Sequence, residues 1–153
     1  MHIKDICRRS LVTCRRELSV ARVAQLMRDQ FVEDVVVVED RAGRLVPVGI
    51  VTFRDMIVRV IANHADPDKT SASDIMSDTL EAAHETELIY SAILRMRNKR
   101  ITRLIVVDSH DALVGVLTAD DVTDFLASEL IEVARISPHH VALESGTGEP
   151  TSA

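Results

Sequence analysis

The chain is poor in aromatic residues, with three Phe, one Tyr and no Trp among 153 residues. Hydrophobic residues nevertheless make up 46% of it, so the core that they form is aliphatic, of Val, Ile, Leu and Ala. A chain of this length forms one ordinary domain or two small ones. The composition therefore predicts a chain that can bury a proper hydrophobic core.

Basic residues are also in the minority, since 18 Lys and Arg stand against 24 Asp and Glu, for a formal net charge of −6. Nucleic-acid-binding domains normally carry a basic excess, so we expect no nucleic-acid partner. No apolar run reaches 18 residues and no apolar segment follows the N-terminus, so we expect neither a membrane span nor a signal peptide. The two cysteines, Cys7 and Cys14, have no secretory context. Reduced thiols and a cytoplasmic location are the resulting expectations.

What the chain does contain is an internal repeat. Residues 49–55 (Gly-Ile-Val-Thr-Phe-Arg-Asp) and 115–121 (Gly-Val-Leu-Thr-Ala-Asp-Asp) share one pattern: Gly, two apolar strand formers, Thr, two variable residues and Asp. Each motif follows an apolar run, at residues 35–38 and 104–107. Similarity at a fixed period indicates tandem structural units.

The duplication extends beyond these motifs. Asp5-Ile6-Cys7 aligns with Asp74-Ile75-Met76, and Met27-Arg28 with Met96-Arg97, all at an offset of 69 residues. The two motif glycines are three residues closer than that offset. Repeat 1 therefore has the longer hairpin turn, within residues 39–48.

Each repeat is predicted to be a β-α-β-β-α unit. In repeat 1 we expect a strand at 11–14, a helix capped by Ser19, strands at 35–38 and 50–51, and a helix opening at Thr52. Asp40, Gly43 and Pro47 are the expected turn residues of the long hairpin.

Repeat 2 follows the same order. It is predicted to have strands at 104–107 and 115–117 and a last helix that runs from Thr118 to about Arg135.

The domain organisation follows from these elements. Repeat 1 spans residues 1–63, a linker spans 64–73, repeat 2 spans about 70–136, and the Ser-, Thr-, Gly- and Pro-rich tail at 137–153 is expected to be mobile. One such unit has little core of its own. We therefore predict an α/β (α+β) fold in which two repeats pack sheet to sheet, with pseudo-two-fold symmetry and helices outside.

The two matched motifs and their matched Asp-Ile-(Met/Cys) starts resemble a pair of CBS domains, a Bateman module. The resemblance covers about residues 3–136, so the sequence looks like a stand-alone pair. It implies a regulatory, signal-transducing function, with an adenosine-containing ligand such as AMP, ADP or ATP bound between the repeats. It also implies a homodimer, with the apolar faces of the two motif helices as candidate interfaces (Met56, Ile57 and Val60; Val122, Phe125 and Leu126).

The Thr-x-x-Asp segment of each motif has two compatible interpretations. Thr at an N-cap with Asp three residues later approximates a capping box, and Asp suits the positive end of a helix dipole. In CBS domains this Asp also holds the ribose of the ligand, since a carboxylate can accept hydrogen bonds from both hydroxyls of a cis-diol.

The resemblance implies two clefts, each built from the motif of one repeat and the opposite wall from the other. The first, preferred cleft combines Thr52, Asp55, Leu80, Ile101 and Arg103. The second, weaker cleft combines Val12, Val32, Thr118 and Asp121.

The clefts are predicted to differ in charge. Arg103 in repeat 2 aligns with Asp34 in repeat 1, beside Glu33. Because two carboxylates repel a phosphate, the second cleft is expected to stay empty or to take an adenosyl group without phosphate, such as S-adenosylmethionine.

Three classes of function are thus considered. The leading one is an adenine-nucleotide sensor read by an effector protein; an NAD-like ligand is a further option. The alternative is a ligand-free structural or protein-interaction module that dimerises. An enzyme is not expected, because no nucleophile, paired acid and base, or metal-ligand cluster is recognisable, and no catalytic cofactor is predicted.

Overall fold

The computed structural model describes residues 1–136. Two compact units divide the chain, Met1–Val122 and Thr123–Ala153, and both repeat motifs belong to the first. The predicted tail at 137–153 lies outside the described residues.

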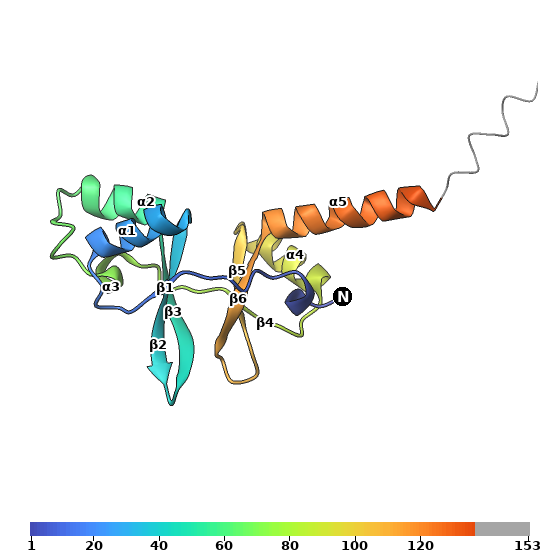
Figure 1. Ribbon diagram of the computed structural model, residues 1–153, viewed down its shortest axis with the longest axis horizontal. Helices are drawn as coiled ribbons and strands as arrows, with labels where there is room; N and C mark the ends of the chain where they lie inside the picture. Colours follow the sequence, from blue (N-terminus) through green and yellow to red (C-terminus); the bar gives the residue numbers. More distant parts are fainter. Residues whose placement is uncertain (137–153) are drawn as a thin grey trace, which may run out of the picture. The chain divides into compact units, whose positions relative to one another are not determined.

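Two three-stranded sheets, one per repeat, form the centre of the first unit (Figure 1). The strands of the first sheet are β1 (Thr13–Cys14), β2 (Asp34–Arg41) and β3 (Arg44–Thr52). Those of the second are β4 (Ala82–His84), β5 (Arg103–Val107) and β6 (Leu113–Thr118). In each sheet the short first strand runs parallel to the second, and the second and third form an antiparallel hairpin.

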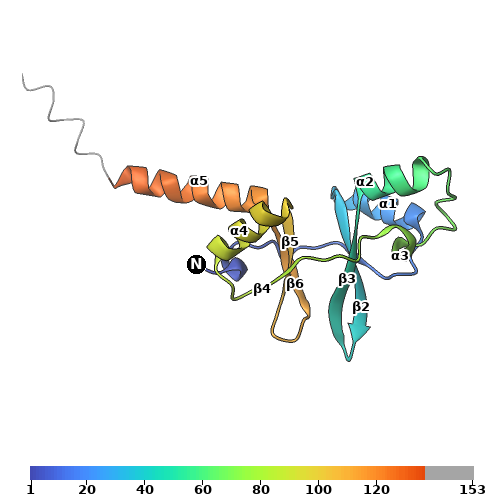
Figure 2. The ribbon, with the colours of Figure 1, turned by 180° about the vertical axis from the view of Figure 1, so that it is seen from behind.

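Helices lie outside the two sheets, which face each other in both views (Figures 1 and 2). The helices of the first half are α1 (Val20–Gln30), α2 (Phe53–Asp55), η2 (Met56–Ile61) and α3 (Ala72–Ile75). η1 (Ile3–Asp5) and α4 (Ile89–Lys99) cover the second sheet, and α5 (Ala119–Arg135) begins in the first unit and continues into the second. The α/β pair packed sheet to sheet is therefore confirmed, as is the end of the last helix at Arg135.

Two clusters of buried residues can be followed in the described part of the hydrophobic core. Side chains on the facing surfaces of the sheets pack together between the repeats: Val36, Val38, Ile105, Val107 and Val116. A second cluster lies under the helices of the first half and includes Val23, Val35 and Val51, all with no exposed surface. The uninterrupted valines of β2 are thus explained, because both faces of that strand are covered.

The opening segment of each repeat packs on the other repeat. The N–H groups of Ile3 and Lys4 donate to the carbonyls of Glu87 and Glu85, at 2.9 Å each. Ala72 and Ile75, which open repeat 2, are buried in the cluster of the first half. Each sheet and its helices are therefore completed by the opening segment of the other sequence repeat.

The helix that follows β3 differs from the prediction. Thr52 is the N-cap as expected, but only α2 is α-helical, and η2 continues as a π-helix. A π-type turn widens the backbone ladder, so side chains after Met56 leave the 3.6-residue period on which the prediction relied.

The start of α1 also departs from the sequence argument. Ser19 is the N-cap, yet its side chain makes no capping hydrogen bond. Instead, the carbonyls of Thr70 and Pro67 accept from the N–H groups of Val20 and Ala21, at 2.8 and 3.0 Å. The linker thus supplies the acceptors that a capping side chain would otherwise provide.

The long hairpin turn forms at Ala42 and Gly43, both with positive φ, and the Asp40 carboxylate accepts from the Gly43 N–H at 2.8 Å. Pro47 is not a turn residue, because it lies within β3 opposite Val38, where the register of the hairpin shifts. A proline is tolerated at such a bulge, since it has no N–H to contribute to the ladder.

Candidate functional site

The second motif forms a complete capping box at the start of α5. The Thr118 N–H and hydroxyl both donate to Asp121 Oδ2, at 2.8 and 2.6 Å, and the Asp121 N–H donates to Thr118 Oγ1 at 3.1 Å. The first motif repeats this arrangement, with Thr52 and Asp55 joined at 2.9, 2.8 and 3.4 Å. The capping interpretation of both Thr-x-x-Asp segments is thereby confirmed.

Each capping box lies beneath the opening segment of the other repeat. The backbone of Arg8 exchanges two hydrogen bonds with Val116, at 2.9 and 3.0 Å, and Ser77 does the same with Ile50. The motif glycine permits this approach, because a Cβ on Gly115 would lie 2.6 Å from the carbonyl oxygen of Arg8. Close packing against the opening segment of the other repeat thus explains both motif glycines, since a Cβ on Gly49 would clash with the sulfur of Met76.

Arg8 and Ser77 occupy equivalent positions but differ in chemistry. The guanidinium of Arg8 lies 2.9 Å from Asp121 Oδ1 and donates to Thr118 Oγ1 at 3.3 Å. In the first motif the corresponding carboxylate, Asp55, has a more distant cation, Arg59, at 3.8 Å. Asp121 is thus the more completely neutralised of the two motif carboxylates.

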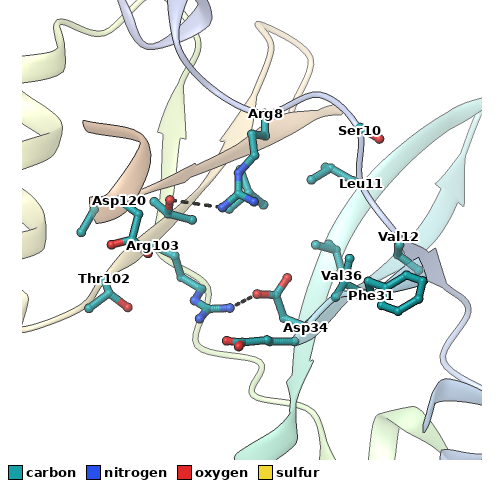
Figure 3. Close-up of a pocket in the computed structure, with 15 residues that line it drawn as sticks. Arg8, Ser10, Leu11, Val12, Phe31, Asp34, Val36, Thr102, Arg103 and Asp120 are labelled. Carbon is teal, nitrogen blue, oxygen red and sulfur yellow. Dashed lines mark hydrogen bonds and ion pairs between the residues drawn. The ribbon is translucent and has the colours of Figure 1, made fainter. Parts of the chain in front are cut away.

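A cleft of about 510 Å³ opens between the two sheets, next to the second motif (Figure 3). Its size is within the range of ligand pockets, about 300–1,000 Å³. One wall is aliphatic and combines both repeats: Leu11, Val12, Val32, Val36 and Val116.

The rest of the cleft is polar and carries charges of both signs. Two arginines, Arg8 and Arg103, and three carboxylates, Glu33, Asp34 and Asp120, line it among the described residues. Arg103 forms an ion pair with Asp34 across the repeats (Figure 3). Both arginines are therefore already paired with carboxylates.

The residues predicted for the second cleft come together. Val12, Val32 and Thr118 all line it. The carboxylate of Asp121 is hydrogen-bonded to Thr118, although Asp121 is not itself one of the lining residues. Val12 and Val32 come from repeat 1 and Thr118 from repeat 2, the combination that the family resemblance implies.

Of the five residues predicted for the first cleft, only Arg103 lines the cleft described above. Thr52 and Asp55 form the other capping box, Leu80 packs against the cluster between the sheets, and the Ile101 N–H donates to the Met96 carbonyl at 3.0 Å. Arg103 lines the second cleft, beside Thr118, its partner in the β5–β6 register.

Sequence reasoning missed two notable lining residues, Arg8 and Phe31. A signal existed, since they align with Ser77 and Arg100 at the offset of 69 and differ from them in chemistry. Within the described residues no group of His, Cys, Asp and Glu has the arrangement of a metal site. None of the described helices combines the length and the apolar character needed to cross a membrane.

Comparison with known proteins matches the model of the CBS domain family to residues 3–62 and 72–128. Uncharacterized protein MK0525 of Methanopyrus kandleri is 30% identical over 120 residues, which are 78% of this chain and 60% of that protein. The chain thus spans about three fifths of the length of this relative.

Solved structures of CBS pairs have the same architecture. The CBS domain protein PAE2072 from Pyrobaculum aerophilum, complexed with AMP, superposes with a TM-score of 0.72 at 26% identity and covers 88% of this chain and 99% of its own. The CBS domain pair of protein MJ0100, in complex with 5′-methylthioadenosine and S-adenosyl-L-methionine, gives a TM-score of 0.70 at 26% identity, covering 84% and 98%. With two matched domains, a shared fold and the repeated capping-box motif, the chain belongs to the CBS domain family.

Proposed function

We propose that this protein is a regulatory module that binds an adenosine-containing ligand between its two CBS repeats. The observation that carries the proposal is the cleft, whose aliphatic wall comes from Val12 and Val32 of one repeat and whose polar edge includes Thr118 of the other. A purine base suits the aliphatic wall, and a ribose suits the hydroxyl and carboxylate acceptors. The AMP complex and the adenosyl complexes of related CBS pairs support this class of ligand.

Ribose binding in this cleft requires a change at Arg8. Oδ2 of Asp121 is occupied by its capping hydrogen bonds, and Oδ1 is paired with Arg8. The Arg8 side chain is 62% exposed, so its ion pair contributes little free energy and a ribose hydroxyl can replace it at small cost.

The charges of the second cleft favour an adenosyl ligand without phosphate. Three lining carboxylates stand against two arginines, and each arginine is held by a carboxylate. The carboxylates would repel a phosphate group, and neither arginine is unpaired to attract it. S-adenosylmethionine and 5′-methylthioadenosine fit this environment better than AMP, ADP or ATP.

A phosphate-bearing nucleotide remains our proposal for the first cleft, at Thr52, Asp55, Leu80, Ile101 and Arg103. Arg103 lines the second cleft in this structure, so it would have to leave Asp34 and turn towards the first cleft to contact the phosphate. The ligand would then change the contact between the repeats, and an effector protein could read that change, because a ligand shifts a conformational equilibrium only by binding its two states differently.

A second candidate function is a homodimeric interaction module that binds no ligand. Large apolar side chains are exposed on α2 and η2, at Phe53, Ile57, Val58 and Ile61. Such a cluster is typical of a protein-protein contact. Of the predicted interface residues, Val60 and Val122 are instead buried in the core.

The decisive experiment is isothermal titration of the wild type, Asp55→Ala and Asp121→Ala with AMP, ADP, ATP, S-adenosylmethionine and 5′-methylthioadenosine. The two variants are matched controls, because each removes the carboxylate from the capping box of its own motif. We expect Asp121→Ala to lose the adenosyl ligands selectively and Asp55→Ala to lose the nucleotides selectively.

Equal losses in both variants would contradict the assignment of the clefts. If the wild type binds none of the five ligands, ligand sensing is wrong, and sedimentation of the free protein then tests the homodimer. Binding should also raise Tm, since a ligand at ~100 times its Kd adds about 2.7 kcal/mol of stability.

A further inference from the structure

Phe31 has an unusual conformation and environment. It is the C-cap of α1, with left-handed backbone angles (φ 54°, ψ 44°). Its side chain is 94% exposed, yet it lines the cleft. Figure 3 shows its ring beside Val12 and Val36, on the aliphatic side.

The folded chain alone gives no reason for an aromatic residue here. Left-handed C-caps are usually Gly or Asn, and a bulky side chain is strained in this conformation. An exposed ring also gains nothing from burial. Arg100, the equivalent residue at the end of α4, has φ 55° but carries a charged side chain that water solvates well.

The backbone under Phe31 is fixed on both sides. Its own N–H donates to the Arg28 carbonyl at 3.4 Å, and the N–H of Val32 donates to the Met27 carbonyl at 3.1 Å. Only the two side-chain torsions are therefore free, so the ring can be ordered on a ligand at low entropic cost.

We propose that Phe31 stacks on the purine base of the ligand and covers it against the aliphatic wall of Val12 and Val32. This inference rests on the proposed function and deepens it. Phe31 is the one aromatic side chain among the described residues that line the cleft. It would make a flat aromatic base, rather than the ribose alone, the part of the ligand that this cleft selects.

The test uses Phe31→Gly and Phe31→Tyr, with Arg100→Gly as the matched control at the other helix end. Titration with 5′-methylthioadenosine should give about 5- to 150-fold weaker binding for Phe31→Gly, the loss expected from ~1–3 kcal/mol of stacking per base. Phe31→Tyr and Arg100→Gly should bind as the wild type does. Phe31→Gly should not lower Tm, because Gly relieves the left-handed strain.

A second measurement places the base directly. Since the chain has no Trp, Phe31→Trp introduces a single indole at the cleft, and Arg100→Trp introduces one at the equivalent position. We expect saturable quenching by 5′-methylthioadenosine in Phe31→Trp alone.

The outcomes distinguish the inference from the function on which it rests. Wild-type affinity in Phe31→Gly, or equal quenching in both Trp variants, would overturn the role of Phe31 and leave ligand binding intact. Failure of the wild type to bind any adenosyl ligand would overturn both.

Discussion

The ion pair between Arg103 and Asp34 allows a quantitative test of the ligand preferences proposed above. The two residues are equivalent in the repeats, 69 positions apart, and their side chains are 32% and 27% exposed. Asp34→Asn keeps the shape of the side chain, removes its charge and releases the guanidinium of Arg103.

This substitution should change both the stability of the protein and its affinity for AMP. Partial exposure places the pair above a typical surface ion pair, so its loss should cost about 1 kcal/mol and lower Tm by about 2–4 °C. The released guanidinium can make a charge-assisted hydrogen bond to a phosphate, worth about 1.5–3 kcal/mol. Asp34→Asn should therefore bind AMP about 10- to 150-fold more tightly and 5′-methylthioadenosine unchanged.

Glu33→Gln is the matched control, because it removes one negative charge from the same cleft without breaking the Arg103 ion pair. Charge alone, acting over about 8 Å in water, is worth about 0.5 kcal/mol, or about twofold in Kd. Calorimetric titration with AMP and 5′-methylthioadenosine gives the ratio of the two affinities in each variant.

Equal changes of that ratio in Asp34→Asn and Glu33→Gln would contradict this prediction, since net charge would then explain both. An unchanged Tm in Asp34→Asn would contradict it as well. A double-mutant cycle with Arg103→Gln should return a coupling energy of about 1 kcal/mol in the free protein, within the range for contacting residues.

Two further predictions concern stability. Leu104→Ala should lower the free energy of unfolding in urea by about 2–5 kcal/mol, because Leu104 has no exposed surface, whereas the exposed Leu45→Ala should change it by no more than about 0.5 kcal/mol; similar losses in both would contradict the core described here. Burial raises the pKa of the Cys14 thiol from 9.0 to about 11, so above pH 9 the unfolded chain releases this proton before the folded one does. The free energy of unfolding should then fall between pH 9 and 11, by at most about 1.4 kcal/mol per pH unit; urea midpoints that fall no more steeply in the wild type than in Cys14→Ala would refute the assignment.

Much of the fold could be predicted because its signals are local and occur twice. The valines at 35–38 and the apolar run at 104–107 predicted buried strands, and both lie in their sheets. Their hairpins shift register at equivalent places, between Val37 and Val38 and between Val106 and Val107. The capping boxes at Thr52 and Thr118 were readable because Thr and Asp three residues apart satisfy each other.

Other features depend on contacts distant in sequence and were not predictable. The N-terminal segment at Ile3 pairs with residues near Glu87, and linker carbonyls, rather than the Ser19 side chain, accept from the first N–H groups of α1. The π-type turn at Met56–Ile61 has no local sequence signature comparable to a cap.

For the candidate site, the structure brings together some of the residues that the family pattern grouped, and their role in binding stays a prediction. Val12, Val32 and Thr118 were expected in one cleft and all line it. Arg8 and Phe31 were not predicted, because each differs in chemistry from the equivalent residue of the other repeat, Ser77 and Arg100.

These departures all concern one cleft, and that bears on how a duplicated chain specialises. Position 8 is Arg where the other repeat has Ser77, and position 31 is Phe where the other has Arg100. Both lie at the second cleft, where Arg8 pairs with the Asp121 carboxylate and Phe31 presents an aromatic ring.

The backbone at the equivalent positions is the same in both repeats, as the paired hydrogen bonds of Arg8 and Ser77 and the left-handed caps at Phe31 and Arg100 demonstrate. Folding requirements therefore do not account for the differences in side chain. A requirement that acts on one cleft alone, such as the ligand selection proposed above, would account for them. Substitutions that exchange these side chains between the repeats should for this reason change ligand preference far more than stability.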